Sequence, residues 1–314
     1  MILAGDIGGT KSLFGVYDGE QLVTECRLAN ADFSCFEQVI AALFAQPDFS
    51  RMAIERVCFA VAGPIDDDGG GAHLTNLNWQ VNAPALAARF GLPAIRLIND
   101  FAAAALGAVT AKSTQLHTLQ PGTPLAAAPR LVIGAGTGLG MAIVLPETAG
   151  NQRWRVIPGE GGHIAFAPAD EQQLALWHFL RQRHTRVTWE RVISGPGLAA
   201  IHSFVAGLST DIDPSEIGRL GIAEPESPAG QALRLFVTLY GACTGDMALS
   251  VLPRGGVFLA GGIAEKILPA MSNGCFVAAF NDKAYHARLV ERMPIHLVTD
   301  ARLGLRGAAL GAQT

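Results

Sequence analysis

Two short apolar runs joined by a turn of glycine and threonine form a pattern that occurs twice in this chain, and it limits the possible folds more than any other feature. In the first copy the turn GDIGGT (Gly5–Thr10) follows Ile2–Ala4, and in the second the turn GAGTGLG (Gly134–Gly140) follows Leu131–Ile133. Short apolar runs bounded by glycine predict β-strands that reverse direction at the turn. Two such hairpins, about 130 residues apart, indicate a duplicated architecture.

Strands precede helices through the second half of the sequence, and this order predicts the α/β class. Further strands are expected at Gln21–Arg27, Arg56–Val61, Arg96–Ile98, Val257–Leu259 and Pro294–Val298. Helices are expected at Phe36–Ala45, Pro84–Phe90, Phe101–Ala111, Glu171–Arg183, Gly197–Val205, Ala229–Leu252, Ile263–Met271 and Leu303–Leu310. The polar stretch Lys112–Pro129, with three prolines, is the least patterned and is expected to be a surface loop between lobes.

The composition argues against several classes of protein. Hydrophobic residues make up 50% of the 314 positions and charged residues only 16%, which argues against disorder. The net charge of −4 argues against nucleic-acid binding. The longest uncharged apolar run, Leu131–Pro146, has 16 residues, fewer than a membrane-spanning helix needs. Five cysteines without close CxxC spacing exclude a cysteine-rich zinc site and a disulfide framework, and the start of the chain does not resemble a signal peptide, so a cytoplasmic protein is expected.

Glycine-rich turns suit phosphate binding, because glycine lets the backbone approach a ligand and successive N–H groups can surround an anion. The first turn also carries a carboxylate, Asp6, and a carboxylate beside phosphates indicates Mg²⁺. A third glycine cluster, Gly255-Gly256 and Gly261-Gly262, surrounds a strand that leads into a helix, an arrangement that suits a nucleotide. The alternative is that these glycines only form tight hairpins. Three such turns in one chain favour the phosphate interpretation.

Other nucleotide-binding motifs are not matched. GxxxxGK[ST] does not occur, which disfavours a P-loop protein. The dinucleotide-binding fingerprint fails because Leu139 stands where its third glycine is needed. The run Asp66-Asp67-Asp68 is interpreted as a solvated hairpin tip rather than a metal site, because glycines follow it directly.

In their order along the chain, the motifs resemble those of the bacterial glucokinase family, part of the superfamily of hexokinases, actin and heat-shock ATPases. The resemblance covers essentially the whole chain and rests on GDIGGT, LTNLNW (Leu74–Trp79), INDF (Ile98–Phe101), GAGTGLG, PGEGGH (Pro158–His163), ERVISGPGL (Glu190–Leu198) and GGVFLAGGI (Gly255–Ile263). GDIGGT alone is shared by many sugar kinases, whereas INDF, PGEGGH and ERVISGPG in this order are highly specific. The zinc motif CxCGxxGCxE of the related repressor–kinase branch does not occur, so no zinc is expected. Lys11 stands where enterobacterial-type members often have Asn, which indicates a divergent subgroup.

This resemblance implies a two-lobed actin-like ATPase (ribonuclease H-like) fold, with a small and a large α/β domain and a cleft between them. The small domain is expected to span residues 1–108 and to be completed by the C-terminal helix within residues 300–314. The large domain is expected to span residues 109–299. The family also implies lobes that close over the sugar, and a homodimer whose interface the sequence does not show.

The implied activity is the ATP-dependent phosphorylation of D-glucose at its 6-hydroxyl, with Asp100 as the general base that accepts the hydroxyl proton. From its position alone, between a short strand and an alanine-rich helix, Asp100 is better explained as a helix cap, and the two roles are compatible. Glu160 and His163 are interpreted as ligands of sugar hydroxyls rather than of a metal, because the two glycines between them argue against a helix. The resemblance assigns the sugar to Asn76, Asn99, Asp100, Gly138, Glu160, His163 and Glu190.

The nucleotide is assigned to Gly5, Asp6, Ile7, Gly8, Gly9, Thr10, Gly136, Thr137, Gly261 and Gly262, with Asp6 orienting Mg²⁺ through water. The sequence leaves open ADP or polyphosphate as the phosphoryl donor, and mannose or fructose as the acceptor. A non-catalytic sugar sensor on the same fold is a further alternative. It is disfavoured because the chain begins at the first strand, without room for a DNA-binding module, and retains Asp100.

Overall fold

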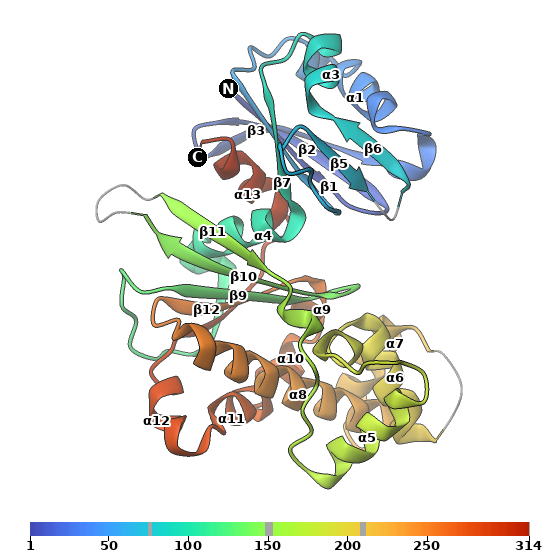
Figure 1. The fold of residues 1–314 in the computed structure, drawn as a ribbon, viewed down its shortest axis with the longest axis vertical. Helices are drawn as coiled ribbons and strands as arrows, with labels where there is room; N and C mark the ends of the chain where they lie inside the picture. Colours follow the sequence, from blue (N-terminus) through green and yellow to red (C-terminus); the bar gives the residue numbers. More distant parts are fainter. Residues whose placement is uncertain (75–76, 148–152, 208–211, 314) are drawn as a thin grey trace. The chain divides into compact units, whose positions relative to one another are not determined.

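A computed structural model describes residues 1–74, 77–147, 153–207 and 212–313, which form two compact units (Figure 1). The first unit comprises Met1–Ala111, Asn151–Val156 and Asp300–Thr314, and the second comprises Lys112–Gly150 and Ile157–Thr299. Each unit is built around a β-sheet that carries helices, so the prediction of the α/β class is confirmed. Within the described ranges, no helix combines the length and the apolar character needed to cross a membrane.

The sheet of the first unit has the strand order β3-β2-β1-β4-β7. Its strands are β1 (Ile2–Ile7), β2 (Lys11–Asp18), β3 (Gln21–Ala29), β4 (Arg56–Val61) and β7 (Ile95–Asn99). The predicted first strand ends at Ala4, but β1 continues through Gly5, Asp6 and Ile7, because its backbone pairs with β2 on one side and with β4 on the other over its whole length. The turn between β1 and β2 is therefore shorter than the motif and consists of Gly8–Thr10.

Alternate residues of this sheet face two separate apolar layers, as the two-residue period of a strand requires. Leu3 and Ile7 face one layer, which includes residues of α1 (Phe36–Phe44), α2 (Pro47–Ser50), α3 (Ala83–Phe90) and the hairpin of β5 (Gly71–Leu74) and β6 (Trp79–Asn82). Ile2 and Ala4 face the other layer, with residues of α4 (Asp100–Val109) and α13 (Leu303–Gly311). The C-terminal helix α13 thus packs on a sheet made from the first hundred residues.

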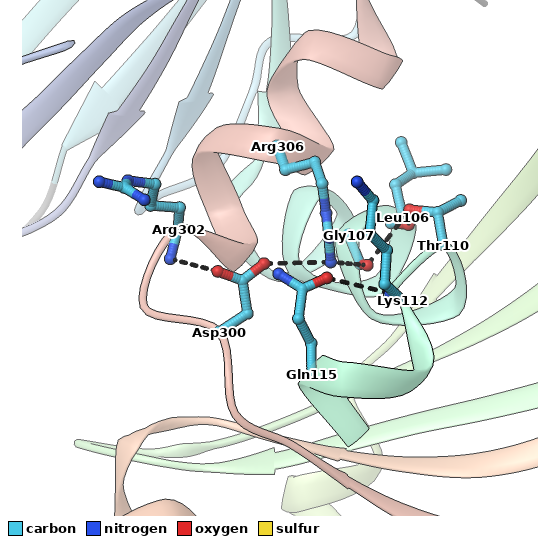
Figure 2. A network of polar contacts seen from close by, with 8 residues as sticks. All are labelled: Leu106, Gly107, Thr110, Lys112, Gln115, Asp300, Arg302 and Arg306. Carbon is cyan, nitrogen blue, oxygen red and sulfur yellow. Dashed lines mark hydrogen bonds and ion pairs between the residues drawn. The ribbon is translucent and has the colours of Figure 1, made fainter. Parts of the chain in front are cut away.

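Helices α4 and α13 approach each other closely at two glycines. A Cβ atom at Gly107 would meet the carbonyl oxygen of Leu303, and one at Gly307 would overlap the carbonyl oxygen of Ala103. The Arg306 guanidinium donates to the Gly107 carbonyl at 2.7 Å and pairs with Asp300 at 3.1 Å, as Figure 2 shows. Close backbone contact and a partly buried ion pair therefore hold the two helices together inside the first unit.

The second sheet, which belongs to the second unit except for the first half of β11, has the strand order β11-β10-β9-β12-β13-β8. Its strands are β8 (Leu116–Gln120), β9 (Arg130–Ala135), β10 (Leu139–Pro146), β11 (Trp154–Gly159), β12 (Gly256–Ala260) and β13 (Ile295–Val298). In both sheets an antiparallel hairpin is followed by two parallel strands: β1–β2 by β4 and β7, and β9–β10 by β12 and β13. The prediction of a duplicated architecture is confirmed.

Helices of the second unit bury residues of β9, β12 and β13 in one large apolar cluster. They are α5 (Glu171–Arg181), α6 (Gly195–Ala206), α7 (Pro214–Ala223), α8 (Pro228–Val251), α9 (Gly262–Lys266), α10 (Leu268–Met271), α11 (Cys275–Asn281) and α12 (Ala287–Val290). Short 3₁₀ turns across the chain are η1 (Asn30–Asp32), η2 (Ser113–Gln115), η3 (Gly161–His163), η4 (Trp189–Arg191) and η5 (Ala284–His286). The long helix α8 places Phe236 and Tyr240 at the centre of the cluster, both fully buried.

Two predicted elements differ in the structure. The expected surface loop at 112–129 is wrong for Leu116–Gln120, which form β8 and pair antiparallel with β13 at the edge of the sheet. An edge strand keeps residues such as His117 and Thr118 exposed, so its composition does not indicate a strand. The expected helix Ile263–Met271 is divided into α9 and α10, because Pro269 has no N–H group with which to continue the helical hydrogen bonds.

Replacing Gly307 by alanine is expected to lower the free energy of unfolding by about 2 kcal/mol, because the new methyl group overlaps backbone that has no room to move. Urea denaturation of the wild type and the variant measures this difference. Gly311→Ala in the same helix is the matched control, since its Cβ would meet only side-chain ends, Cδ1 of Ile98 at 2.9 Å and Sγ of Cys58 at 3.3 Å. Equal stability of the two variants would contradict this account of the helix contact.

Candidate active site

In the first unit, two carboxylates interact at the carboxyl ends of parallel strands. Asp6 lies near the end of β1 and Asp100 directly follows β7, and both strands run parallel to β4. Burial, together with the charge of Asp100, raises the pKa of Asp6 to about 6, while the Lys11 ammonium group acts in the opposite direction. The carboxyl ends of parallel strands are the common position of ligand sites in α/β proteins.

Asn99, and not Asp100, caps helix α4. The Asn99 side chain accepts hydrogen bonds from the backbone N–H groups of Phe101 at 3.0 Å and Ala102 at 3.1 Å. Asp100 is the first residue of the helix, and its Oδ1 accepts from the next N–H group, that of Phe101, at 2.7 Å. The interpretation of Asp100 as the helix cap is therefore wrong, because the residue before it already has the extended backbone that a cap needs.

The environment of Asp100 favours its protonated form. Burial raises the pKa of this carboxyl group, and its hydrogen bond with the Phe101 N–H group opposes the shift only in part. A carboxylate with a raised pKa is a stronger base than a solvated one, since it holds a proton at a pH where an ordinary aspartate has lost it. The electrostatics of this position suit a group that accepts a proton.

In the second unit, the glycine turn between β9 and β10 is supported from three directions. The Glu190 Oε2 atom accepts from the Leu139 N–H group at 3.0 Å. The Gly195 N–H group, at the start of α6, donates to the Gly136 carbonyl at 2.8 Å. From the core, the hydroxyl of buried Tyr240 accepts from the Ala135 N–H group at 3.3 Å.

Glu190 therefore lies directly against the turn that the sequence assigns to phosphate. A Cβ atom on Gly138 would stand 2.5 Å from its Oε2 atom, so only glycine leaves room for this carboxylate. The Ser194 hydroxyl donates to the Glu190 carbonyl at 2.7 Å and accepts from the Gly197 N–H group at 3.1 Å, which joins the segment to the first turn of α6. The structure thus brings Gly136, Gly138 and Glu190 together.

Glu160 and His163 form a second, more exposed pair in the same unit. The His163 Nε2 atom lies 3.8 Å from the Glu160 Oε2 atom, and the two side chains are 59% and 89% exposed. They lie at either end of the short turn η3, which confirms that no α-helix carries them. Both polar groups are accessible to a ligand rich in hydroxyl groups.

Gly261 and Gly262 lie at the end of β12, beside the same glycine turn. Gly261 has a φ angle of +88°, and a Cβ atom there would stand 2.5 Å from the carbonyl oxygen of Ala135. Gly262 begins the short helix α9, and the position of its Cβ atom is open. Two glycine clusters of the second unit are thus adjacent.

The predicted site residues fall into one group in each unit. The first unit holds Gly5, Asp6, Ile7, Gly8, Gly9, Thr10, Asn99 and Asp100, and the second holds Gly136, Thr137, Gly138, Glu160, His163, Glu190, Gly261 and Gly262. Asn76 lies outside the described residues. Sequence reasoning missed the residues that hold the turns from within, notably Tyr240, which had no motif to mark it.

Comparison with known proteins identifies the family of this chain. The glucokinase family model matches residues 3–314. The chain belongs to the glucokinase family. It is 37% identical to the glucokinase of Trichormus variabilis, with 99% of this chain and 98% of that protein covered.

Solved structures of glucokinases show the same fold. A glucokinase from an Antarctic psychrotroph is 30% identical, with a TM-score of 0.87 and coverage of 99% of this chain and 98% of that one. A glucokinase from Balamuthia mandrillaris, crystallised with glucose, is 21% identical, with a TM-score of 0.81 and coverage of 100% and 93%. The fold of this glucokinase family member is the two-domain actin-like ATPase fold, and the resemblance on which the sequence analysis rests is confirmed.

Replacing Gly138 by alanine is expected to weaken glucose binding about tenfold, because the methyl group displaces the Glu190 carboxylate from the turn. Calorimetric titration with glucose, without nucleotide, measures the change. Gly136→Ala in the same turn is the matched control, since nothing lies within 4 Å of its Cβ position, and its glucose affinity should equal that of the wild type. An unchanged affinity in Gly138→Ala would contradict the role given to the Glu190–turn contact.

Proposed function

We propose that this protein transfers the γ-phosphoryl group of ATP to the 6-hydroxyl of D-glucose. Membership of the glucokinase family supports this reaction. The structural observation that supports it best is Asp100, a carboxylate with a raised pKa. Asn99, and not Asp100, caps helix α4. We further propose a cytoplasmic enzyme, in keeping with its five free cysteines. A homodimer is proposed from the family resemblance.

Asp100 is the general base of the proposed reaction. The 6-hydroxyl becomes a better nucleophile as its proton passes to the Asp100 carboxylate, while the oxygen forms its bond to the γ-phosphorus. Because its pKa is raised, the Asp100 carboxylate binds the proton of the sugar hydroxyl more strongly than a solvated aspartate would. The hydrogen bond from the Phe101 N–H group holds the Oδ1 atom of this carboxylate in place.

The sugar is held by Glu160, His163, Glu190, Asn99 and Asn76, with the backbone of Gly138 beside them. Carboxylates and imidazole accept hydrogen bonds from the hydroxyl groups of a sugar ring. Glu190 is already oriented by the Leu139 N–H group, so it loses less rotational freedom on binding than a free side chain would. Glu160 and His163 are exposed and available to the other hydroxyls.

The nucleotide is held by the backbone of Gly8–Thr10 and Gly136–Gly138, with Gly261 and Gly262 beside the adenosine. Mg²⁺ fits Asp6, because a half-buried carboxylate next to a second negative charge is stabilised by a cation, and Mg²⁺ accepts one carboxylate while keeping its waters. When bound, the ion would neutralise charge on the transferring phosphoryl group. Among the residues that the structure describes, no group of three histidine, cysteine or acidic side chains is placed to hold a metal.

A coupled assay over several sugars and donors tests the proposed reaction. We expect the highest kcat/KM with glucose and ATP, at least about tenfold above mannose or fructose, since one altered hydroxyl contact in a hydrogen-bonding site changes the transition state strongly. ADP and polyphosphate are expected to support little turnover. A higher kcat/KM with another hexose or another donor would replace the proposed substrate pair.

Replacing Asp100 by asparagine is expected to lower kcat about 1,000-fold while glucose affinity and unfolding free energy stay near wild type. Asparagine keeps the size of the side chain but accepts no proton. Asp170→Asn is the matched control, because Asp170 also accepts a backbone N–H group at the start of a helix, from Gln173 at 2.8 Å, and asparagine caps equally well. Near-wild-type turnover in Asp100→Asn would exclude it as the base.

A further inference from the structure

We propose that Asn30 is a positioning residue for nucleotide binding, because it sets the direction of the peptide groups in the turn Gly8–Thr10. Asn30 lies just after β3, in η1, and is 1% exposed. No motif includes it, and it is about 20 residues from the turn in the sequence. The inference rests on the proposed function, since it concerns the turn to which the nucleotide is assigned.

Three hydrogen bonds join Asn30 to the turn and to Ser12 of β2. The side-chain Nδ2 atom donates to the Gly8 carbonyl at 2.8 Å. The side-chain Oδ1 atom accepts from the Ser12 hydroxyl at 2.7 Å. The backbone N–H group of Asn30 donates to the Thr10 carbonyl at 3.0 Å. One buried residue thus bonds to both ends of the turn. Because the Ser12 hydroxyl donates to Oδ1 of Asn30, the Nδ2 atom of the same amide is directed at the Gly8 carbonyl.

The bond to the Gly8 carbonyl determines where the next N–H group points. A trans peptide is planar, with its C=O and N–H bonds directed oppositely. Because the Gly8 oxygen is held toward buried Asn30, the Gly9 N–H group points away from it. Among the described residues, no backbone acceptor takes a hydrogen bond from Gly9 N. A backbone N–H group held in this orientation is a donor for an anion such as a phosphate.

Loss of this contact would leave the Gly8 carbonyl free to rotate, and a carbonyl oxygen turned toward a phosphate repels it. The glycines on either side offer no steric resistance to that rotation, because glycine is permissive in both φ and ψ. The effect falls on the phosphate chain of the nucleotide. Glucose and the adenosine part are assigned to other residues and should be unaffected.

Asn30→Ala tests this role. We expect the dissociation constant for ATP with Mg²⁺ to rise about tenfold, as for the loss of a buried hydrogen bond, while those for adenosine and for glucose stay within twofold of wild type. Asn82→Ala is the matched control from the same unit. The Asn82 side chain also bonds to backbone, accepting from the Ala85 N–H group at 2.9 Å, but it caps α3 far from the turn in sequence, so only stability should fall.

Ser12→Ala is the second variant and decides the question if Asn30→Ala does not fold. It removes the donor that orients the Asn30 amide, and we expect a smaller but selective rise in the ATP dissociation constant, about threefold. Unchanged ATP affinity in the folded variants, or an equal loss for adenosine, would overturn the role of Asn30. A wild-type protein that binds no ATP would instead refute the proposed function, so the two failures are distinguishable.

Discussion

Backbone pairing confines the backbone that we propose to bind the nucleotide to two turns. In each unit the strand that leads into the glycine turn, β1 or β9, is paired with a neighbour on both sides. Paired N–H and C=O groups are unavailable to a ligand, and buried unpaired ones are costly. N–H groups outside the ladder therefore occur where it ends, at Gly8–Thr10 and Gly136–Gly138. Within these turns the Gly8 N–H group donates to the Lys11 carbonyl and the Gly136 N–H group to the Gly138 carbonyl. The rest of the architecture determines how these two short turns are held.

Both turns are held from the inside by side chains that lie outside the turn in sequence. Asn30 and Ser12 hold the first turn, and Tyr240 with Glu190 holds the second. These polar groups lie beside or within the core, where a hydrogen bond meets less competition from water than at the surface. A rigid support of this kind allows glycine, the most flexible residue, to be used in a turn that needs a defined shape.

Sequence patterns predicted the elements that carry local signals and missed those defined by long-range contact. The β1–β2 and β9–β10 hairpins, the family and the fold followed from glycine spacing and motif order, because turns and strands leave their signal in adjacent residues. Asn30 and Tyr240 carry none, since the atoms they bind lie some 20 and 105 residues away. Strand β8 was missed because half-exposed edge residues resemble a loop, and the cap of α4 was assigned one residue too late.

The many glycines of this chain have two separate structural roles, which composition alone does not distinguish. Sixteen of the 36 glycines lie in five short motif segments, but steric contact explains glycines outside them as well. Gly107 and Gly307 permit the close approach of α4 and α13, and Gly241 of α8 meets the Phe276 carbonyl. Within the motifs, Gly138 leaves space for Glu190 rather than only for a ligand. Packing and binding thus use the same property, the lack of a side chain.

The pair Asp6 and Asp100 shows how the same burial opposes stability and favours binding. Asp6 has a pKa of about 6 in the folded protein against an ordinary value of 3.8. The folded state therefore holds a proton that the unfolded state has lost between these two values, and the stability contribution of Asp6 falls as the pH rises through that interval. At neutral pH the ionised Asp6 carboxylate is a poorly solvated charge, which destabilises the folded protein. A cation bound there, as proposed for Mg²⁺, would offset this destabilisation, and the offset would add to its affinity for the folded protein.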